Sequence, residues 1–433
     1  MLAALVEIVL DGAVGHSPLI PKSPDISAWL RGTGIGERLG YRVFLIALIA
    51  FSGAYAGILA LVGRAAKGRG SADGGQGSAT THIPVRWAIG LVGALQVIVF
   101  LGPILISTDV FSYIAYARMG VVHGVNPYTH GPRAILGDPV YRYVGNDWKH
   151  VATAYGPLYT LLSYPLAPLG VVGAVWGMKL YALLTGAGTL LLTWRGAARR
   201  GLDPVFALLA VGANPLWVIY GLGGAHNDLI MTFLMMGAVS FALVERDIEA
   251  GATVMAGTLV KATAAALLPF MVLARLRMGG VGGVRGLALG IVGALALATL
   301  AALAAFGVHG IDIVAALNRD AAFVSTDSFP TEVAHLFGKP GVFPVDHALL
   351  KLGLGMVVVY LLACTWRGYD WVAASGWTLL AITVTSSWLL AWYTLWPLPL
   401  AAIVRDRRLL CAILAVQVLF VVHQISPLLA PVT

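Results

Sequence analysis

Long apolar runs recur along the whole chain, and they constrain its fold more than any other feature. A membrane-spanning helix needs about 20 predominantly apolar residues. Stretches that approach this length cover residues 44–62, 87–106, 172–194, 204–221, 229–244, 287–306, 348–364, 371–390 and 409–422. Only 11% of all residues are charged, whereas soluble domains have about a quarter. Lipid must therefore be the main solvent, and we predict an all-α polytopic protein of the plasma membrane.

The basic residues predict how this chain crosses the bilayer. Residues 64–86 are rich in Gly and Ser and include Arg64, Lys67 and Arg69, so the positive-inside rule places them in the cytoplasm. Residues 107–155 then lie outside, and their Tyr, Pro, His and Asp content predicts an ordered outer loop. A second outer loop covers residues 309–346. The net charge of +8 is spread between apolar runs, which fits cytoplasmic loops and gives no contiguous face for nucleic acid.

The N-terminal residues 1–41 form the first of two expected regions. Residues 1–14 are too short and too charged for a convincing span, so we expect an interfacial or partial helix there. Residues 42–433 then form a single transmembrane domain.

Two apolar segments cannot cross the membrane simply. Basic clusters at residues 195–200, 275–285 and 405–408 should all be cytoplasmic. Residues 156–169 must then be short or re-entrant, and residues 251–274 have cytoplasmic ends on both sides, with Lys261 between them. Irregular backbone at membrane depth persists only where protein or a cavity shields it. Both segments therefore predict a cavity.

Asp109 is the first candidate for chemistry, at the outer end of a predicted span. An aspartate there can cap the following helix, or its carboxylate can act as a general base at the mouth of the cavity. Tyr113 follows it by four residues and Tyr116 by seven, near one helix face. Tyrosines provide an apolar ring and a hydroxyl, which suit a sugar.

A run of polar residues, His226, Asn227 and Asp228, follows two glycines at the start of a predicted span. A tight turn with a helix cap explains the run, but polar groups at that depth are costly unless they are used. No third ligand stands nearby in the sequence, so we expect no metal there.

Three further features have both an ordinary and a functional interpretation. Lys261 either extends its ammonium to the interface or binds a phosphate. The segment 388–397 includes Trp392 and Tyr393 and is either an aromatic belt or part of the site. Cys364 and Cys411 lie in apolar stretches outside any CxxC motif and are expected to be inert.

Taken in order, several short motifs resemble those of one family. They are Ser107-Thr-Asp-Val-Phe-Ser-Tyr, Gly124-Val-Asn-Pro-Tyr, Tyr155-Gly-Pro, Asn214-Pro, Gly223-Gly-Ala-His-Asn-Asp, Val260-Lys-Ala-Thr-Ala and Trp392-Tyr-Thr-Leu-Trp-Pro. This order is similar to that of the actinobacterial α-(1→6)-mannopyranosyltransferases, within the glycosyltransferase C superfamily. The family often has Arg at the position of Thr108 and Glu at that of Asp228, and it has one more clear span before Phe44.

The resemblance implies a fold, a donor and a site. The fold is of the glycosyltransferase C type, with about 10–13 transmembrane helices, some re-entrant or broken. The donor is a polyprenyl-phosphate sugar used at the extracytoplasmic face, with Asp109 as the catalytic carboxylate. The expected residues for donor phosphate or substrate are Lys261, His226, Asn227, Asp228, Tyr113, Arg118, Tyr128, Tyr155, Trp392 and Tyr393. No nucleotide, metal or other cofactor is required.

The sequence therefore favours a membrane glycosyltransferase that transfers mannose, or a similar hexose, to an extracytoplasmic glycan or glycolipid with inversion. The alternative is a transporter or flippase of lipid-linked sugars, which would use the same cavity. Transporters tend to have interrupted helices in two related halves, and no such halves are visible in this sequence.

Overall fold

All regular structure that the chain adopts in the described residues is helical. The computed structural model describes residues 1–14, 22–24, 26, 41–68, 83–278, 280–308, 324–325 and 328–429, and no strand occurs among them. Most of the expected cytoplasmic segment 64–86, much of the second outer loop 309–346 and most of residues 15–41 lie outside this set. The all-α prediction is therefore confirmed for the described residues.

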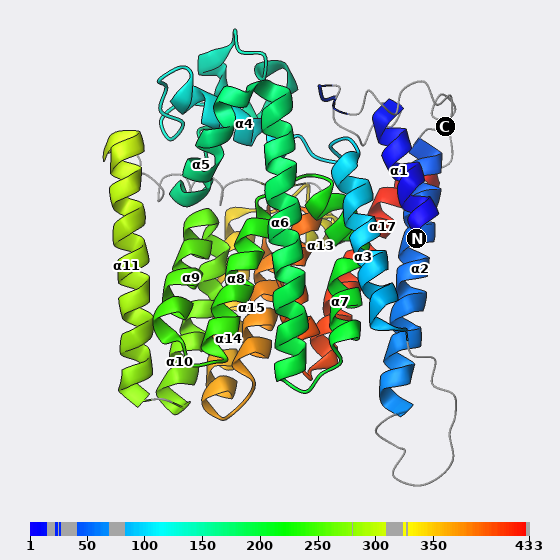
Figure 1. Ribbon diagram of the computed structural model, residues 1–433, viewed down its shortest axis with the longest axis vertical. Helices are drawn as coiled ribbons and strands as arrows, with labels where there is room; N and C mark the ends of the chain where they lie inside the picture. The colour runs from blue at the N-terminus through cyan, green and yellow to red at the C-terminus, as the bar shows by residue number, and fades with distance from the viewer. Residues whose placement is uncertain are drawn as a thin grey trace.

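Long helices run side by side, and short helices form a separate layer at one end of them (Figure 1). The first half of the chain contains α1 (Leu2–Val14), α2 (Tyr41–Gly68), α3 (Val85–Leu101), α4 (Asp109–Val121), η3 (Pro132–Ile135), η4 (Tyr141–Tyr143), η5 (Asn146–Trp148), α5 (Pro157–Ser163), η6 (Tyr164–Leu169), α6 (Gly170–Arg199), α7 (Pro204–Gly212) and the π-helix η7 (Leu216–Leu222).

The second half continues the bundle. It contains α8 (Asp228–Ala242), α9 (Asp247–Val260), η8 (Ala262–Leu267), α10 (Leu268–Met278), α11 (Gly280–Phe306), α13 (Phe329–Leu336), α14 (Pro344–Trp366), α15 (Trp371–Thr385), η10 (Ala391–Leu395), α16 (Leu398–Ala402) and α17 (Arg407–Leu429). The expected N-terminal helix is present as α1, which buries Leu5 and Ile8 completely and packs against α2 and α3.

Four helical stretches in the described residues are long and apolar enough to cross a membrane. They are Arg42–Gly63, Pro157–Arg199, Gly280–Phe306 and Pro344–Trp366, and the pair α7 and η7, bent by 51°, makes a fifth if it is one span. The helices α3, α8 and α15 are apolar but shorter. Several expected spans form helices shorter than this length, and the expected total of about 10–13 transmembrane helices stays a prediction. For example, α3 ends at Leu101, where Gly102 and Pro103 interrupt the helix.

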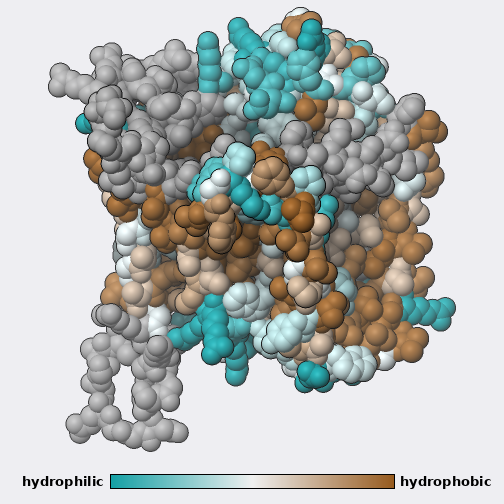
Figure 2. Space-filling view, turned by 180° about the vertical axis from the view of Figure 1, so that it is seen from behind, coloured by the Kyte–Doolittle hydropathy of each residue, from teal (hydrophilic) through white to brown (hydrophobic). Residues whose placement is uncertain are grey.

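The surface of the bundle is suited to lipid. A band of hydrophobic side chains lies between hydrophilic groups at the two ends of the molecule (Figure 2). On α11 the side chains of Leu297 and Leu300 are 72% and 66% exposed, and on α14 those of Val359 and Tyr360 are 66% and 67% exposed. Water would not tolerate this contiguous apolar surface, so the chain is a multi-pass helical membrane protein.

The segment 156–169 folds back on the helix that follows it. The Tyr159 hydroxyl lies 3.6 Å from Sδ of Met178, and the Tyr181 hydroxyl donates to the Leu162 carbonyl over 3.1 Å. A straight helix would separate residues 19 positions apart by about 28 Å. The chain turns at Gly170, whose φ is +68°. As expected, this segment is short and does not continue α6 as one straight span.

The segment 251–274 is a helical hairpin broken at Lys261. Lys261 is extended, with φ −153° and ψ 125°, between α9 and η8. Asp247, at the start of α9, pairs with Arg275 in α10, with the Arg275 Nε 2.7 Å from the Asp247 Oδ1. Both ends of the hairpin therefore lie together, and Lys261 occupies its apex. This geometry resolves the conflict in the sequence between two cytoplasmic ends and one apolar segment.

The expected outer loop 107–155 is ordered, as predicted, and forms the layer of short helices above the bundle (Figure 1). Its centre is Asp138, whose two carboxylate oxygens each accept from Nε of Arg118 over 2.9 Å. His123 Nε2 lies 2.7 Å from the same carboxylate. Burial opposes ionisation of Asp138, but the bonds from Arg118 and His123 hold the pKa of this carboxyl below its usual value.

Candidate active site

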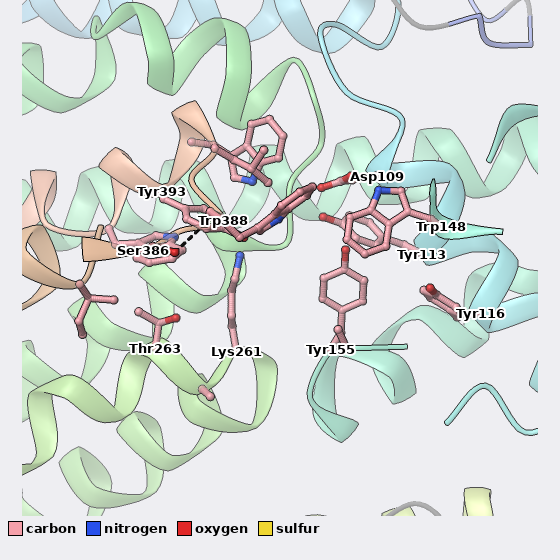
Figure 3. A pocket seen from close by; sticks show the side chains of 16 residues that line it. Asp109, Tyr113, Tyr116, Trp148, Tyr155, Lys261, Thr263, Ser386, Trp388 and Tyr393 are labelled. Carbon is pink, nitrogen blue, oxygen red and sulfur yellow. Dashed lines mark hydrogen bonds between the residues drawn. The ribbon is translucent and has the colours of Figure 1, made fainter. Parts of the chain in front are cut away.

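A cavity of about 250 Å³ lies where the ordered layer meets the apex of the α9–α10 hairpin. Residues from distant parts of the chain line it together (Figure 3): Asp109, Tyr113, Tyr116, Trp148, Ala154, Tyr155, Lys261, Ala262, Thr263, Ile382, Ser386, Trp388, Leu390, Trp392, Tyr393 and Trp396. The predicted cavity therefore exists, and it contains one carboxylate and one ammonium group among aromatic rings.

Asp109 lies on the cavity wall at the first residue of α4. The N-cap of this helix is Thr108, and no side chain makes a capping hydrogen bond there. The Asp109 amide instead donates to the Ser107 hydroxyl over 3.1 Å. The capping interpretation of Asp109 is therefore not supported, and its carboxylate, with a side chain 14% exposed, is available to a molecule in the cavity.

A neutral imidazole stands behind this carboxylate. The Nδ1 of His226 lies 3.6 Å from Oδ2 of Asp109 and 3.4 Å from the Tyr113 hydroxyl. The His226 ring stacks on Trp392, with centroids 3.9 Å apart and planes 22° apart. Burial lowers the pKa of His226 to about 3, so the ring orients its neighbours without adding charge.

The pKa of Asp109 is matched to proton transfer near neutrality. Burial raises this pKa from 3.8 to about 6. The positive charge of Lys261 lowers it, the negative charge of Asp228 raises it, and the bond with Ser107 lowers it. A base is most effective when its pKa is near the working pH, so Asp109 combines ionisation at pH 7 with useful basicity.

Lys261 projects from the hairpin apex into the cavity (Figure 3). Its Nζ donates to Oδ1 of Asp228 over 2.7 Å, and it lies 4.5 Å from the ring centroid of Tyr393 and 5.0 Å from that of Trp396. The Trp396 Nε1 also donates to Oδ1 of Asp228, over 2.6 Å. These aromatic and acidic neighbours fix the ammonium in position. The interpretation that Lys261 only extends to the membrane interface does not explain these contacts.

Aromatic rings form most of the remaining wall. Tyr155 packs edge to face on Tyr113, with centroids 4.9 Å apart. Trp148 from η5 meets Trp388 at 5.8 Å, also edge to face. Trp392 and Trp396 are only 7% and 3% exposed, which excludes the aromatic-belt interpretation for these two residues. Rings with adjacent hydroxyls are suited to binding the faces and edges of a sugar.

Several of these residues were not predicted from the sequence. Trp148 and Ser386 line the cavity but had no local signal, since each stands alone in its segment. Thr263 also lines it and belongs to the motif Val260-Lys-Ala-Thr-Ala, which could have identified it. Trp388 and Trp396 belong to the aromatic run 388–397, and this run was the signal that could have identified them.

Glycines allow the site segments to approach each other. A Cβ on Gly224 would lie 2.6 Å from the His226 ring and 2.7 Å from the Tyr220 carbonyl oxygen. A Cβ on Gly156 would lie 2.0 Å from the Leu259 carbonyl oxygen. Contacts this short are not tolerated, so these positions require glycine. They bring His226 against Trp392 and Tyr155 against the hairpin apex.

Of the three described non-glycine residues with positive φ, Glu245 lies elsewhere and the other two lie on the loops that precede Asp109 and Asp228. Ile106 has φ +68° and Ala225 has φ +51°, a region that side chains with a Cβ rarely adopt. The Leu105 amide donates to the Gly223 carbonyl over 3.0 Å and links the two loops. Strain of this kind often occurs at functional sites.

Five expected site residues are not in the cavity lining: Arg118, Tyr128, His226, Asn227 and Asp228. His226 and Asp228 lie directly behind it, against Asp109 and Lys261. Arg118 is held by Asp138 and by the Ala167 carbonyl, to which its Nη1 donates over 2.9 Å. The Tyr128 hydroxyl donates to the Tyr155 carbonyl over 3.0 Å and packs on Phe306, with ring centroids 5.1 Å apart. Asn227 is buried as the N-cap of α8 without a capping bond from its side chain. Arg118 and Tyr128 thus support the loop around the site.

The fold and the site together define a helical membrane protein with an aromatic cavity that contains one carboxylate and one ammonium group. In the described part of the chain, no three His, Cys, Asp or Glu side chains are grouped to hold a metal ion. Comparison with known proteins gives a more particular result. Residues 5–277 match the family described as Alpha-(1->6)-mannopyranosyltransferase, N-terminal domain, and the chain belongs to this family.

Individual relatives agree with this assignment. The chain is 28% identical over 346 residues to Alpha-(1->6)-mannopyranosyltransferase A of Mycobacterium tuberculosis, which covers 73% of this chain and 66% of that protein. It is 32% identical over 178 residues to the protein of the same name from Corynebacterium glutamicum, covering 40% of this chain and 36% of that one. The matches thus span two thirds or less of these relatives' own length.

Proposed function

We propose that this chain transfers a mannose unit from a polyprenyl-phosphate donor to a hydroxyl group of an extracytoplasmic glycan or glycolipid. The observation that supports this most is that Asp109 and Lys261 both line one aromatic cavity. Membership of the mannopyranosyltransferase family supports the choice of sugar.

The chemical step needs one base and no strong acid. The acceptor hydroxyl gives its proton to the Asp109 carboxylate while its oxygen attacks C1 of the donor sugar. The bond from C1 to the phosphate oxygen breaks, and the polyprenyl phosphate leaves with the electron pair. A single displacement inverts the configuration at C1. Because phosphate is a stable leaving group, a single carboxylate suffices, and its pKa of about 6 allows it to accept the proton at neutral pH.

Lys261 is the proposed contact for the donor phosphate. An ammonium group has three N–H donors, and Asp228 takes one of them in this structure. The side chain is 18% exposed, toward the cavity, so the other donors can reach a phosphate oxygen. Asp228 and Trp396 then act as positioning residues for the lysine.

The aromatic rings and the tyrosine hydroxyls provide the proposed sugar subsites. Tyr113, Tyr155, Trp392 and Tyr393 surround the space between Asp109 and Lys261, where the transferred hexose would sit. His226 holds the ring of Trp392 and the carboxylate of Asp109 in place. Arg118, Tyr128 and Asn227 are proposed to shape this region from outside the cavity.

We place the site on the extracytoplasmic side. The basic clusters 195–200 and 405–408 lie at the ends of α6 and at the start of α17, at the end of the bundle away from the layer 107–155 (Figure 1). The positive-inside rule assigns that end to the cytoplasm. The short helices α3, α8 and α15 would complete a glycosyltransferase C-type bundle with the longer spans.

The decisive experiment is an assay of the purified protein with polyprenyl phosphomannose and a short α-(1→6)-mannoside, read by mass spectrometry. One added hexose, absent with Asp109→Asn, is the expected result. Failure with this donor and with other polyprenyl-phosphate hexoses would overturn the proposal. Movement of the intact donor across a vesicle membrane without transfer would favour the flippase alternative.

A further inference from the structure

A second cavity lies at the other end of the bundle, between α6, α8 and α9. Its volume is about 390 Å³, and it is separate from the cavity that contains Asp109. The lining residues are Leu192, Arg195, Arg199, Phe233, Leu234, Gly237, Ser240, Phe241, Val244, Arg246 and Thr253. We propose that it binds an anionic phospholipid, with the phosphate at Arg195 and Arg199 and an acyl chain along the apolar lining.

The inner part of this cavity is apolar because helices approach closely there. A Cβ on Gly188 of α6 would lie 2.5 Å from the Phe233 ring, so the ring packs directly on that helix. A Cβ on Gly237 of α8 would lie 3.0 Å from Cγ2 of Thr253 on α9. These two contacts close the cavity on two sides and leave a slot lined with aliphatic and aromatic carbon, which suits an acyl chain.

The mouth of the cavity is cationic. Arg195 and Arg199 are four residues apart on α6, so their guanidinium groups lie on the same face of the helix. Arg246 adds a third guanidinium group, with its Cζ 5.0 Å from the Phe241 ring centroid. The Nη2 of Arg246 also donates to Glu249 over 2.6 Å. No carboxylate lines the cavity itself.

The arginines at this mouth differ from basic residues nearby. Arg200, the next residue, pairs with Asp370, Arg275 pairs with Asp247, and Arg277 donates to the Thr365 carbonyl over 2.9 Å. Within the described ranges, Arg195 and Arg199 have no ion-pair partner in the protein. Two guanidinium groups beside an apolar slot complement an amphiphile with a phosphate head group, since the geometry of the guanidinium matches that of phosphate.

Lipid selection by the purified protein tests the proposal. Phosphatidylglycerol and phosphatidylcholine are titrated separately into protein in neutral detergent, and bound lipid is measured by native mass spectrometry. Arg195→Gln with Arg199→Gln should weaken phosphatidylglycerol binding about thirtyfold, as expected for two basic residues at an anionic membrane surface. The matched control, Arg285→Gln with Arg367→Gln, removes the same charge from exposed residues outside the cavity. It should change the affinity for phosphatidylglycerol less than about twofold.

A thiol placed inside the cavity tests where the lipid binds. Ser240→Cys, in a background with Cys364→Ala and Cys411→Ala, should react with a maleimide more slowly when phosphatidylglycerol is present. Phosphatidylcholine should not protect it, and Arg199→Gln alone should remove the protection. Equal affinity for the two lipids, an equal loss in the matched control, or protection by inorganic phosphate alone would overturn the proposal. This test is independent of sugar transfer.

Discussion

The ammonium of Lys261 and the carboxylate of Asp228 form a buried pair, with 2.7 Å between Nζ and Oδ1. The side chain of Asp228 is 1% exposed, and Trp396 donates to the same oxygen. Lys261 lies at the break of a helical hairpin and Asp228 at the start of α8. The pair therefore joins two irregular points of the backbone and fixes the floor of the proposed active site.

This pair predicts a pattern of stability in a double-mutant cycle. Lys261→Met leaves the buried Asp228 carboxylate without its cation, and breaking such a pair typically costs roughly 3–5 kcal/mol. Lys261→Met with Asp228→Asn removes the stranded charge, so the double variant should unfold at a higher temperature than Lys261→Met alone. Thermal unfolding in detergent measures the unfolding temperatures of both variants. Losses that simply add would show that the two groups do not interact energetically.

Lys261→Met should also raise the KM for the polyprenyl-phosphate donor by about thirtyfold or more, because loss of a buried charged partner typically costs ~2–5 kcal/mol. The KM for the mannoside acceptor should change far less. Lys149→Met removes the same charge from a lysine in the outer layer that is not part of the cavity lining and is the matched control. Initial rates over both substrate concentrations distinguish the effects. An unchanged donor KM would assign Lys261 to a structural role.

Asp109→Asn should fold and bind donor, yet lose about 10²–10⁴ in kcat. The change preserves size and removes only charge and basicity. Asp147→Asn, an exposed aspartate of the same outer layer, should remain near the parent rate. Donor binding measured beside turnover separates a chemical defect from misfolding. Near-normal turnover in Asp109→Asn would remove its assignment as general base.

The pH profile should report the same carboxylate. Burial raises the pKa of Asp109 to about 6, and a general base works only when it is ionised. The value of kcat/KM should therefore be level above about pH 7 and fall about tenfold for each pH unit well below 6. Steady-state rates from pH 4.5 to 8.5 measure this, with stability checked at each pH. Persistence of the same acidic limb in Asp109→Asn would assign it to another group.

Cysteine labelling on intact cells should establish the orientation. In a background with Cys364→Ala and Cys411→Ala, Gly137→Cys should react with a membrane-impermeant maleimide. Gly137 lies in the outer layer, and a Cβ added there has no heavy atom within 4 Å. Arg367→Cys, in the turn between α14 and α15, should react only after permeabilisation. The opposite pattern would place Asp109 in the cytoplasm and contradict the proposed donor.

The sequence alone determined the class of fold and the irregular points within it. Hydropathy is a local property, so apolar length predicted helices in lipid, and the basic clusters required residues 156–169 and 251–274 to turn back. Both do so, at Gly170 and at Lys261. The sequence also indicated Lys261, since a charged group at membrane depth is costly unless it is used, and Asp109, since it stands at the outer end of a predicted span.

Only the tertiary structure decided which side chains meet. Trp148 packs against Trp388, which lies 240 positions further along the sequence. Arg118 forms an ion pair with Asp138 and does not line the cavity. Neither outcome has a local signal, because ring contacts and ion pairs depend on how separate helices pack. Helix length likewise depends on the local backbone, because α3 and α15 end before the expected spans 87–106 and 371–390 do, at breaks that average hydropathy does not show. Packing between distant segments, not the apolar pattern, assembled the site.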